Sequence, residues 1–295
     1  MRVIRTFALA VTLALVAVVV SVGFYLRAGA TVFRVVKTAS ASQQWTPDKP
    51  LFVLLLGDDL RPGAGCGCTD AIHLVGVPGG GGSAVMIDIP RDTRVDIAGH
   101  GLRKINEAFQ DGPQAAADTV GALVGVSISY VITVGFPEFP QLIDDIGGVT
   151  VNVDMHMADT NSGAFFEPGP RDMNGTEALA FSRARHLGRG DFTRTEHQGQ
   201  LILAVLAKFR AQGTSTVDTM KYLGVMMRYT RTEGISSADL VRLGRLALSI
   251  DPGNVRNVVM PGQGATIAGI SYVVTSPEAP GLFADFADDA TLQSH

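Results

Sequence analysis

Three short, largely apolar runs set the strongest limit on how this 295-residue chain can fold. They lie at 51–56 (LFVLLL), 71–77 and 84–89, and glycine, proline or charged residues close each of them. Runs of this length fit buried strands better than helices. The first ends at Gly57-Asp58-Asp59. It therefore predicts a central strand that carries acidic residues to its C-terminal end, where ligands bind in open α/β sheets.

Helical and strand-like patterns alternate along the rest of the chain. We expect helices at 106–123, 141–146, 173–182, 194–209, 216–230 and 236–249, and strands at 129–136, 149–153 and 255–260, before a loop-rich end. Such alternation favours an α/β fold. The sequence therefore predicts a three-layer α-β-α sandwich with a mixed central sheet.

The N-terminal segment differs from everything after it. Residues 7–26 carry no charge and are long enough to cross a bilayer as a transmembrane helix. With a short basic tail, this predicts a cytoplasmic tail at 1–6, a polar stalk at 27–48 and one extracytoplasmic domain at 49–295 on a single-pass cell membrane protein. A small-residue cleavage site at 28–30 leaves removal as a signal peptide open. Both alternatives place the domain beyond the membrane.

Charge excludes one class of partner. The first 45 residues carry five of the 24 basic residues and no acidic one, which leaves 19 basic against 28 acidic residues and a formal charge of −9. A domain with this balance is not a general polyanion binder, so we expect no nucleic acid partner.

Two features that resemble functional motifs are interpreted as structural. The glycine run at 79–82 lacks the Gly-Lys-Ser/Thr ending of a phosphate loop, and no helix follows it, so it predicts a turn. Cys66 and Cys68 are the only cysteines. They are too few for a closed zinc site, and a disulfide between residues two apart would be strained, so we expect free thiols.

The segment 181–198 (FSRARHLGRGDFTRTEHQ) is the most highly charged part of the chain. It places Arg183, Arg185, Arg189 and Arg194 around His186, Asp191 and His197. Arg183 and Arg185 would share one side of an extended segment, while Arg194, His197, Gln198 and Leu201 would share one face of a helix. A helix N-terminus beside arginines suits phosphate. A solvated, salt-bridged surface is the alternative.

Further charged residues follow the predicted strands: Asp59, Asp70, Arg91, Asp92 and Lys104. Carboxylates of Asp59 and Asp70 could hold a magnesium-type cation while phosphates supply its other ligands. Arginines bind phosphate oxygens with two donors at once. Together these residue types fit phosphoryl transfer, although spacing alone identifies no substrate.

A series of motifs resembles the LytR-CpsA-Psr family of cell-envelope proteins. In order, they are LFVLLLGDDLR (51–61), CTDAIHLVGV (68–77), AVMIDIPRDTRVDIAG (84–99), KINEAF (104–109), FPQLIDDIGGVTVNV (139–153) and MNGTEALAFSRARHLGRGDFTRTEHQ (173–198). The match is collinear over about residues 50–210. The IPRDT, Arg-x-Arg and Gly-Asp-Phe segments are its most specific parts.

The resemblance implies a phosphotransferase at the outer face of the cytoplasmic membrane. Such enzymes transfer a glycopolymer from a polyprenyl-pyrophosphate carrier to the C6 hydroxyl of N-acetylmuramic acid in peptidoglycan, with Mg²⁺, and form a phosphodiester. The lipid tail would need an apolar cavity. Residues 128–134, 201–209 and 217–227 could line one, or could be ordinary core.

The resemblance also implies roles for individual residues. Asp59 and Asp70 would hold magnesium. The pyrophosphate would be contacted by Arg91, Arg183, Arg185, Arg194 and Gln198. Asp191 would orient the arginines, and Lys104 would reach the head group. Apart from the resemblance, we expect an aspartate, with Asp92 or Asp70 the candidates, to assist deprotonation of the sugar hydroxyl.

The chain departs from the family pattern at two positions. Cys68 stands where an arginine is usual, a loss that Arg61 could compensate, and His197 stands where a second arginine is usual. Because histidine titrates near neutrality, activity could depend on pH. Two rival functions stay open: a degenerate protein that binds the lipid carrier or wall polymer without transfer, and a pyrophosphatase acting on the carrier.

Overall fold

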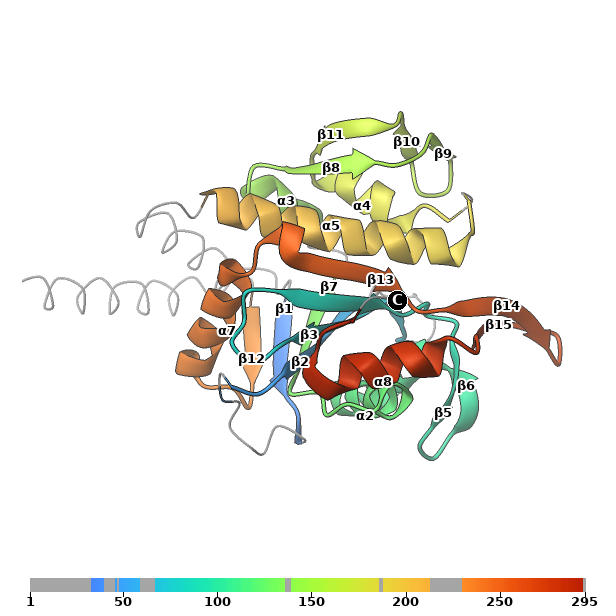
Figure 1. Cartoon of the computed structure of the whole chain (residues 1–295). Coiled ribbons are helices and arrows are strands. Elements are labelled where there is room, and N and C mark those ends of the chain that lie inside the picture. The colour runs from blue at the N-terminus through green and yellow to red at the C-terminus, as the bar shows by residue number, and fades with distance from the viewer. Residues whose placement is uncertain are drawn as a thin grey trace, which may run out of the picture.

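A seven-stranded mixed sheet forms the centre of the computed structural model, which describes residues 33–39, 46, 48–58, 67–135, 139–185, 188–212 and 230–293. The strand order is β12-β1-β7-β2-β3-β4-β13 (Figure 1). The strands are β1 (Phe33–Lys37), β2 (Leu51–Asp58), β3 (Thr69–Val77), β4 (Ala84–Asp88), β7 (Tyr130–Gly135), β12 (Thr230–Glu233) and β13 (Val255–Val259). This sheet confirms the predicted α/β class.

Strand directions bring chemically different segments to one edge. β2 is parallel to β7, β4 is parallel to β13, and β3 runs antiparallel to both β2 and β4. The C-terminal ends of β2, β4, β7 and β13 therefore lie beside the N-terminal end of β3. This edge, called the charged edge below, carries the segments that follow Asp58 and Asp88 and the one that includes Asp70.

Helices cover both faces of the sheet (Figure 1). One face carries α2 (Pro113–Val124) and α8 (Ala279–Asp289), and the other carries α5 (Asp191–Gln212) and α7 (Ser237–Ser249). β2 is buried on both sides because Leu54 and Leu56 pack toward α2 and α8, whereas Leu51 and Val53 join the cluster that includes residues of α7. A nearly continuous apolar run is the pattern expected of such a strand.

A smaller layer lies beyond α5 (Figure 1). It contains α3 (Phe139–Asp145), α4 (Gly175–Arg183) and the antiparallel pairs β8 (Val149–Val153) with β11 (Gly169–Met173) and β9 (Met157–Asp159) with β10 (Ala164–Phe166). Two further hairpins follow β4 and β13: β5 (Arg94–Ile97) with β6 (Gly101–Lys104), and β14 (Gly262–Ile267) with β15 (Ile270–Thr275). Short 3₁₀ helices occupy Ile105–Asp111 and Pro252–Asn254.

The structure corrects the predicted helix at 106–123. It is divided into the 3₁₀ helix Ile105–Asp111 and α2, which are separated at Gly112. Gly112 has a φ of +94°, which favours glycine, and Pro113 lacks the N–H that a continuous helix would use. The predicted helix at 216–230 lies outside the described residues except for Thr230, which begins β12.

Two segments predicted as irregular have regular structure. β1 lies within the predicted stalk at 27–48, and it enters the sheet between β7 and β12 with Val35 buried at its centre. The chain end after residue 260 forms β14, β15 and α8, and Phe283 and Phe286 of α8 enter the core.

The predicted transmembrane helix at 7–26 lies outside the described residues. Among the helices of the described part, none combines the length and the apolar character that crossing a bilayer needs.

Candidate functional site

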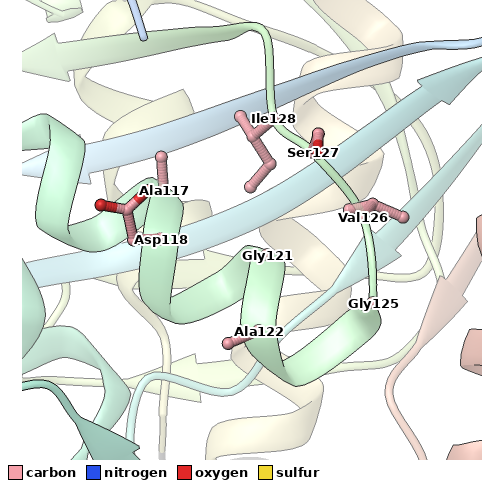
Figure 2. A pocket seen from close by; sticks show the side chains of 8 residues that line it. All are labelled: Ala117, Asp118, Gly121, Ala122, Gly125, Val126, Ser127 and Ile128. Atoms are coloured by element: carbon pink, nitrogen blue, oxygen red, sulfur yellow. The ribbon is translucent and has the colours of Figure 1, made fainter. Parts of the chain in front are cut away.

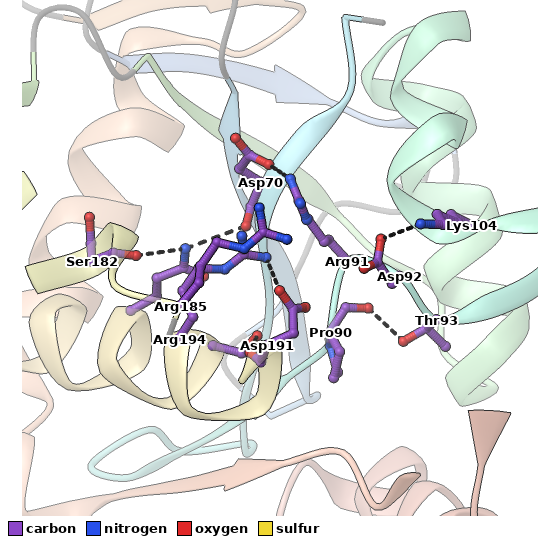
Figure 3. A network of polar contacts seen from close by, with 12 residues as sticks. Asp70, Pro90, Arg91, Asp92, Thr93, Lys104, Ser182, Arg185, Asp191 and Arg194 are labelled. Carbon is purple, nitrogen blue, oxygen red and sulfur yellow. Dashed lines mark hydrogen bonds and ion pairs between the residues drawn. The ribbon is translucent and has the colours of Figure 1, made fainter. Parts of the chain in front are cut away.

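The loop after β4 presents the first charged residues of the site. Thr93 is fully buried, and both its backbone N–H and its hydroxyl donate to the carbonyl oxygen of Pro90, at 3.0 and 2.5 Å. This tight turn holds the intervening Arg91 and Asp92 at the charged edge (Figure 3). Arg91 forms an ion pair with Asp70 of β3.

A second ion pair lies beside the first. Lys104, the last residue of β6, has its Nζ 3.0 Å from Oδ1 of Asp92, and both side chains are partly exposed. The same amine lies 6.0 Å from the ring centre of Tyr272 on β15. The two hairpins thus hold Lys104 between a carboxylate and an aromatic ring.

α4 delivers the Arg-x-Arg segment. Asn174 and Glu177 form a capping box at its first turn, and the Gly175 N–H donates to Oδ1 of Asp144 at 2.7 Å. Gly175 lies so close to α3 that a Cβ there would meet the Pro140 carbonyl oxygen at 1.9 Å. The start of α4 is therefore fixed by α3, and its direction determines where Arg183 emerges.

The prediction that Arg183 and Arg185 share one side of an extended segment is wrong. Arg183 is the last residue of α4, because the helix that begins at the capping box continues through it. Both arginines are exposed at their side chains. The backbone N–H of Arg185 donates at 2.9 Å to Oδ2 of Asp159, which is almost fully buried.

α5 supplies the remaining groups. It begins at Asp191, whose carboxylate lies 2.5 Å from Nη2 of Arg194 in the same first turn. One turn later Gln198 donates through Nε2 to the carbonyl oxygens of Ser182, at 3.2 Å, and Asp70, at 3.4 Å. Gln198 therefore links α4, α5 and β3, and Figure 3 shows the side chains of Arg194, Asp191, Arg91 and Asp70 converging.

The electrostatics of this cluster favour an anion. Arg194 is only 4% exposed, and burial lowers its pKa to about 10, with Asp191 opposing the shift and the neighbouring charges of Arg91 and Arg185 adding to it. Arg194 still carries its charge at neutral pH. Three guanidinium groups from different elements thus lie near one another, and phosphate oxygens would relieve their repulsion.

Comparison with known proteins agrees with this arrangement. The sequence profile of the LytR_cpsA_psr family matches residues 26–282. The chain belongs to the LytR-CpsA-Psr family.

Named relatives fit this membership. The chain is 33% identical over 236 residues to the polyisoprenyl-teichoic acid–peptidoglycan teichoic acid transferase TagU of Oceanobacillus iheyensis. The aligned region covers 77% of this chain and 71% of TagU. Like that relative, this LytR-CpsA-Psr chain is a transferase.

Solved structures share the fold. TagV of B. subtilis superposes with a TM-score of 0.69 at 23% identity, over 83% of this chain and 99% of that one. The family protein YwtF (TagT), solved with bound octaprenyl pyrophosphate lipid, superposes with a TM-score of 0.64 at 23% identity, over 84% and 92%.

Of the two carboxylates predicted to bind magnesium in this LytR-CpsA-Psr protein, the structure describes only Asp70. Asp59 and Arg61 lie outside the described residues. Elsewhere in the described chain, no three His, Cys, Asp or Glu side chains group together as metal ligands. Asp70 is partly exposed, and Arg91 engages one of its oxygens. One carboxylate beside several arginines would suit Mg²⁺ if phosphates bound there, because this ion takes few protein ligands and completes its shell with phosphates and water.

The two positions that depart from the family pattern have structural roles. His197 is fully buried, with Nε2 3.0 Å from Oδ1 of Asp154 and its ring centre 4.6 Å from that of Phe181. The expectation of free thiols is wrong, because Cys68 is disulfide-bonded. The one other cysteine, Cys66, lies outside the described residues. The spacing argument for strain did not exclude the bond.

A shallow hollow of about 350 Å³ lies between α2 and the start of β7 (Figure 2). Its lining residues are Ala117, Asp118, Gly121, Ala122, Gly125, Val126, Ser127 and Ile128. Because β7 begins opposite Val53, far along β2 from Asp58, the hollow lies away from the charged edge. Of the segments predicted to line a lipid cavity, 217–227 lies outside the described residues. Of the other two, 128–134 contributes Ile128 to the hollow, and Leu201 and Phe209 of 201–209 belong to a packed core cluster.

Sequence reasoning missed three contributors to the site. Asp159 holds the backbone of Arg185, the Ser182 carbonyl holds Gln198, and Tyr272 lies under Lys104. Backbone acceptors leave no trace in residue type, and Asp159 is separated from any motif. Only Tyr272 could have been suspected, as the one aromatic residue of the β14–β15 hairpin.

Proposed function

We propose that this transferase moves a phosphate-linked glycopolymer from a polyprenyl-pyrophosphate carrier to peptidoglycan. The observation that supports the proposal most is the convergence of Arg91, Arg185 and Arg194 around Asp70 at the charged edge. The names of TagU and of the octaprenyl-pyrophosphate complex of YwtF (TagT) supply the substrate class.

In the proposed reaction, a sugar hydroxyl of peptidoglycan attacks the phosphorus atom that bears the glycopolymer. The bond from that phosphorus to the bridging oxygen breaks, polyprenyl phosphate leaves, and a phosphodiester remains. Arg91, Arg185, Arg194 and the exposed Arg183 bind the two phosphates and stabilise charge on the leaving group. Asp191 keeps Arg194 oriented through their ion pair.

The hydroxyl proton needs an acceptor. Asp92 and Asp70 are the two candidates, and each is held by one cation in the resting protein. We assign the base to Asp92, since Asp70 is also the proposed metal ligand. Lys104 would have to move away from Asp92 toward the head group when substrate binds.

Asp70, together with Asp59, would hold Mg²⁺, whose charge would add to that of the arginines on the pyrophosphate. Gln198 keeps the Asp70 backbone beside α5.

The proposed location is the outer face of the cell membrane, with residues 7–26 as the span. The strand register supports this. Phe33 pairs with Val134, which also pairs with Gly57 beside the charged edge, so the chain enters the sheet near the proposed site.

A reconstituted reaction tests the proposal. The purified protein is incubated with a synthetic polyprenyl-pyrophosphate glycan, Mg²⁺ and peptidoglycan fragments, and products are identified by mass spectrometry. We expect a phosphodiester-linked product that EDTA abolishes. Lipid phosphate released without a linked product would show a pyrophosphatase, and tight lipid binding with no product would show a binding protein. Either result would overturn the transfer reaction proposed here.

A further inference from the structure

A buried polar network lies where β3, β4, β13 and α5 meet. Nδ1 of His73 on β3 lies 2.6 Å from Oδ1 of Asp88 on β4, and the two residues are register partners, 1% and 0% exposed. On β13, the next strand along the sheet, Asn257 has its side chain nearby. Neither residue of the His–Asp pair belongs to the phosphate-binding cluster.

α5 is packed directly against this network. A Cβ added at Gly199 would come within 2.4 Å of Oδ2 of Asp88 and 2.5 Å of Nδ2 of Asn257. Only glycine therefore lets the helix approach so closely. The preceding residue on α5 is Gln198, which bonds the Asp70 and Ser182 carbonyls.

Each strand of the network also carries a residue of the site or supports one that does. Asp70 is three residues before His73 on β3, and Arg91 is three residues after Asp88. The Asp88 carbonyl oxygen accepts a hydrogen bond from the Met260 N–H at 2.9 Å, which joins the ends of β4 and β13. A shift at the network would therefore move Asp70, Arg91 and Gln198 relative to one another.

Burying these polar side chains costs desolvation free energy that apolar side chains would not cost. Burial raises the pKa of Asp88, the charge and hydrogen bond of His73 oppose the shift, and the charge of Glu196 on α5 adds to it. Nε2 of His73 and Oδ1 of Asn257 are buried and make no hydrogen bond with any described residue. Buried pairs of this kind are poor sources of stability, but they can fix one arrangement of packed elements.

We propose that His73, Asp88 and Asn257 form a positioning network that sets the register of α5 on β3, β4 and β13, so that Arg194 and Gln198 face Asp70 and Arg91. The network touches no substrate. It acts through the residues that do, and this role rests on the proposed transfer reaction.

Two substitutions at Asp88 test the proposal. Asp88→Asn keeps an acceptor for the His73 N–H and the same shape, whereas Asp88→Ala removes both. We expect kcat for transfer to fall about tenfold in Asp88→Asn and roughly 10²-fold in Asp88→Ala, as for a misplacement of catalytic groups. Val120→Ala, a buried residue of α2 on the opposite face of the sheet, is the control for lost core packing and should leave kcat unchanged.

A binding measurement tests the positioning network independently of the transfer reaction. Binding of geranyl pyrophosphate, a soluble prenyl pyrophosphate, is measured by calorimetry for the same proteins. We expect Asp88→Ala to weaken binding about tenfold while circular dichroism shows a folded protein. If the wild-type protein binds this probe but transfers nothing, the reaction is wrong and the binding series still tests the network.

A wild-type kcat and probe affinity in Asp88→Ala would overturn the network's role. The same loss in Val120→Ala would overturn it too, because general destabilisation would then explain both. Should Asp88→Ala fail to fold, Asp88→Asn still decides, since equal kcat values for Asp88→Asn and wild type would contradict positioning by the His73–Asp88 pair.

Discussion

Two pairs, each joining a carboxylate to a basic side chain, have very different surroundings. Asp70 and Arg91 at the charged edge have side chains that are 28% and 20% exposed, whereas His73 and Asp88 beneath them are 2% and 0% exposed. An open pair can exchange its partner for a phosphate. A sealed pair cannot separate without leaving a charge buried and unpaired. The difference indicates that the outer pair serves a ligand and the inner pair serves the fold around it.

The largest expected effect on transfer is that of replacing Arg91 of the outer pair, compared with replacing an ordinary surface arginine. Arg91→Ala should reduce kcat/KM for transfer by about 10²- to 10³-fold, because a preorganised donor to the developing phosphate charge is lost. Initial rates of product formation measure it. Arg103→Ala is the matched control, since Arg103 lies on the adjacent hairpin with a 3.4 Å ion pair to Glu107 and is mostly exposed. Equal activity in both variants would remove Arg91 from the site.

The next effect tests how tightly α5 covers the inner pair. Gly199→Ala should lower the free energy of unfolding by about 1–3 kcal/mol, because its methyl group would overlap the Asp88 carboxylate. Urea unfolding followed by circular dichroism measures it. Gly264→Ala on β14, where a Cβ meets nothing within 4 Å, should change stability by less than about 0.5 kcal/mol. A neutral Gly199→Ala would mean that α5 can move off the network.

A pH series distinguishes the inner pair from the outer one. Because burial raises the pKa of Asp88 above the ordinary value of 3.8, the folded protein holds this proton more tightly than the unfolded chain. Stability from this group is complete below pH 3.8 and is lost as pH rises through the folded-state pKa. Wild-type stability should therefore fall relative to Asp88→Asn as pH is raised from 4 to 7, and thermal unfolding at each pH measures it. A constant difference would show that Asp88 does not titrate in this way.

The smallest effect is expected at the lateral border of the sheet formed by β1 and β12. Arg34 on β1 donates to both carboxylate oxygens of Glu233 on β12, at 3.1 and 2.7 Å, but the two side chains are about 40% exposed. Solvent screens such a pair, so Arg34→Ala should cost less than about 1 kcal/mol and leave transfer unchanged. A large loss of activity would connect this edge to the site.

Local sequence signals predicted the central strands well. The apolar runs that became β2, β3 and β4 are too short for helices, and their burial on both faces matches their composition. β1 and the hairpins were missed for the opposite reason. Their residues are mixed in character. β1 pairs with β7 and β12, which are distant in sequence, so no local pattern encodes it. The hairpins β5–β6 and β14–β15 pair locally, but they lack the apolar runs that marked the central strands.

The site was predictable in its residue types but not in its connections. Motifs placed Arg91, Arg194 and Gln198 in one neighbourhood, and the structure brings them together. The Gln198 contacts are to carbonyl oxygens, and the His73–Asp88 pair depends on the β3–β4 register. Helix α4 ends at Arg183, one residue beyond the predicted helix at 173–182, so Arg183 is helical and not extended.

The parallel pairing of β4 with β13 has a consequence for the order in which the protein is made. Val255 pairs with Ala84, so the last wall of the network comes from a segment synthesised long after Asp70, Arg91 and Arg194. Contacts so distant in sequence form slowly. A nascent chain thus carries its arginines without the scaffold that aligns them until β13 has emerged, and we expect the arrangement of Arg91 and Arg194 to form only then.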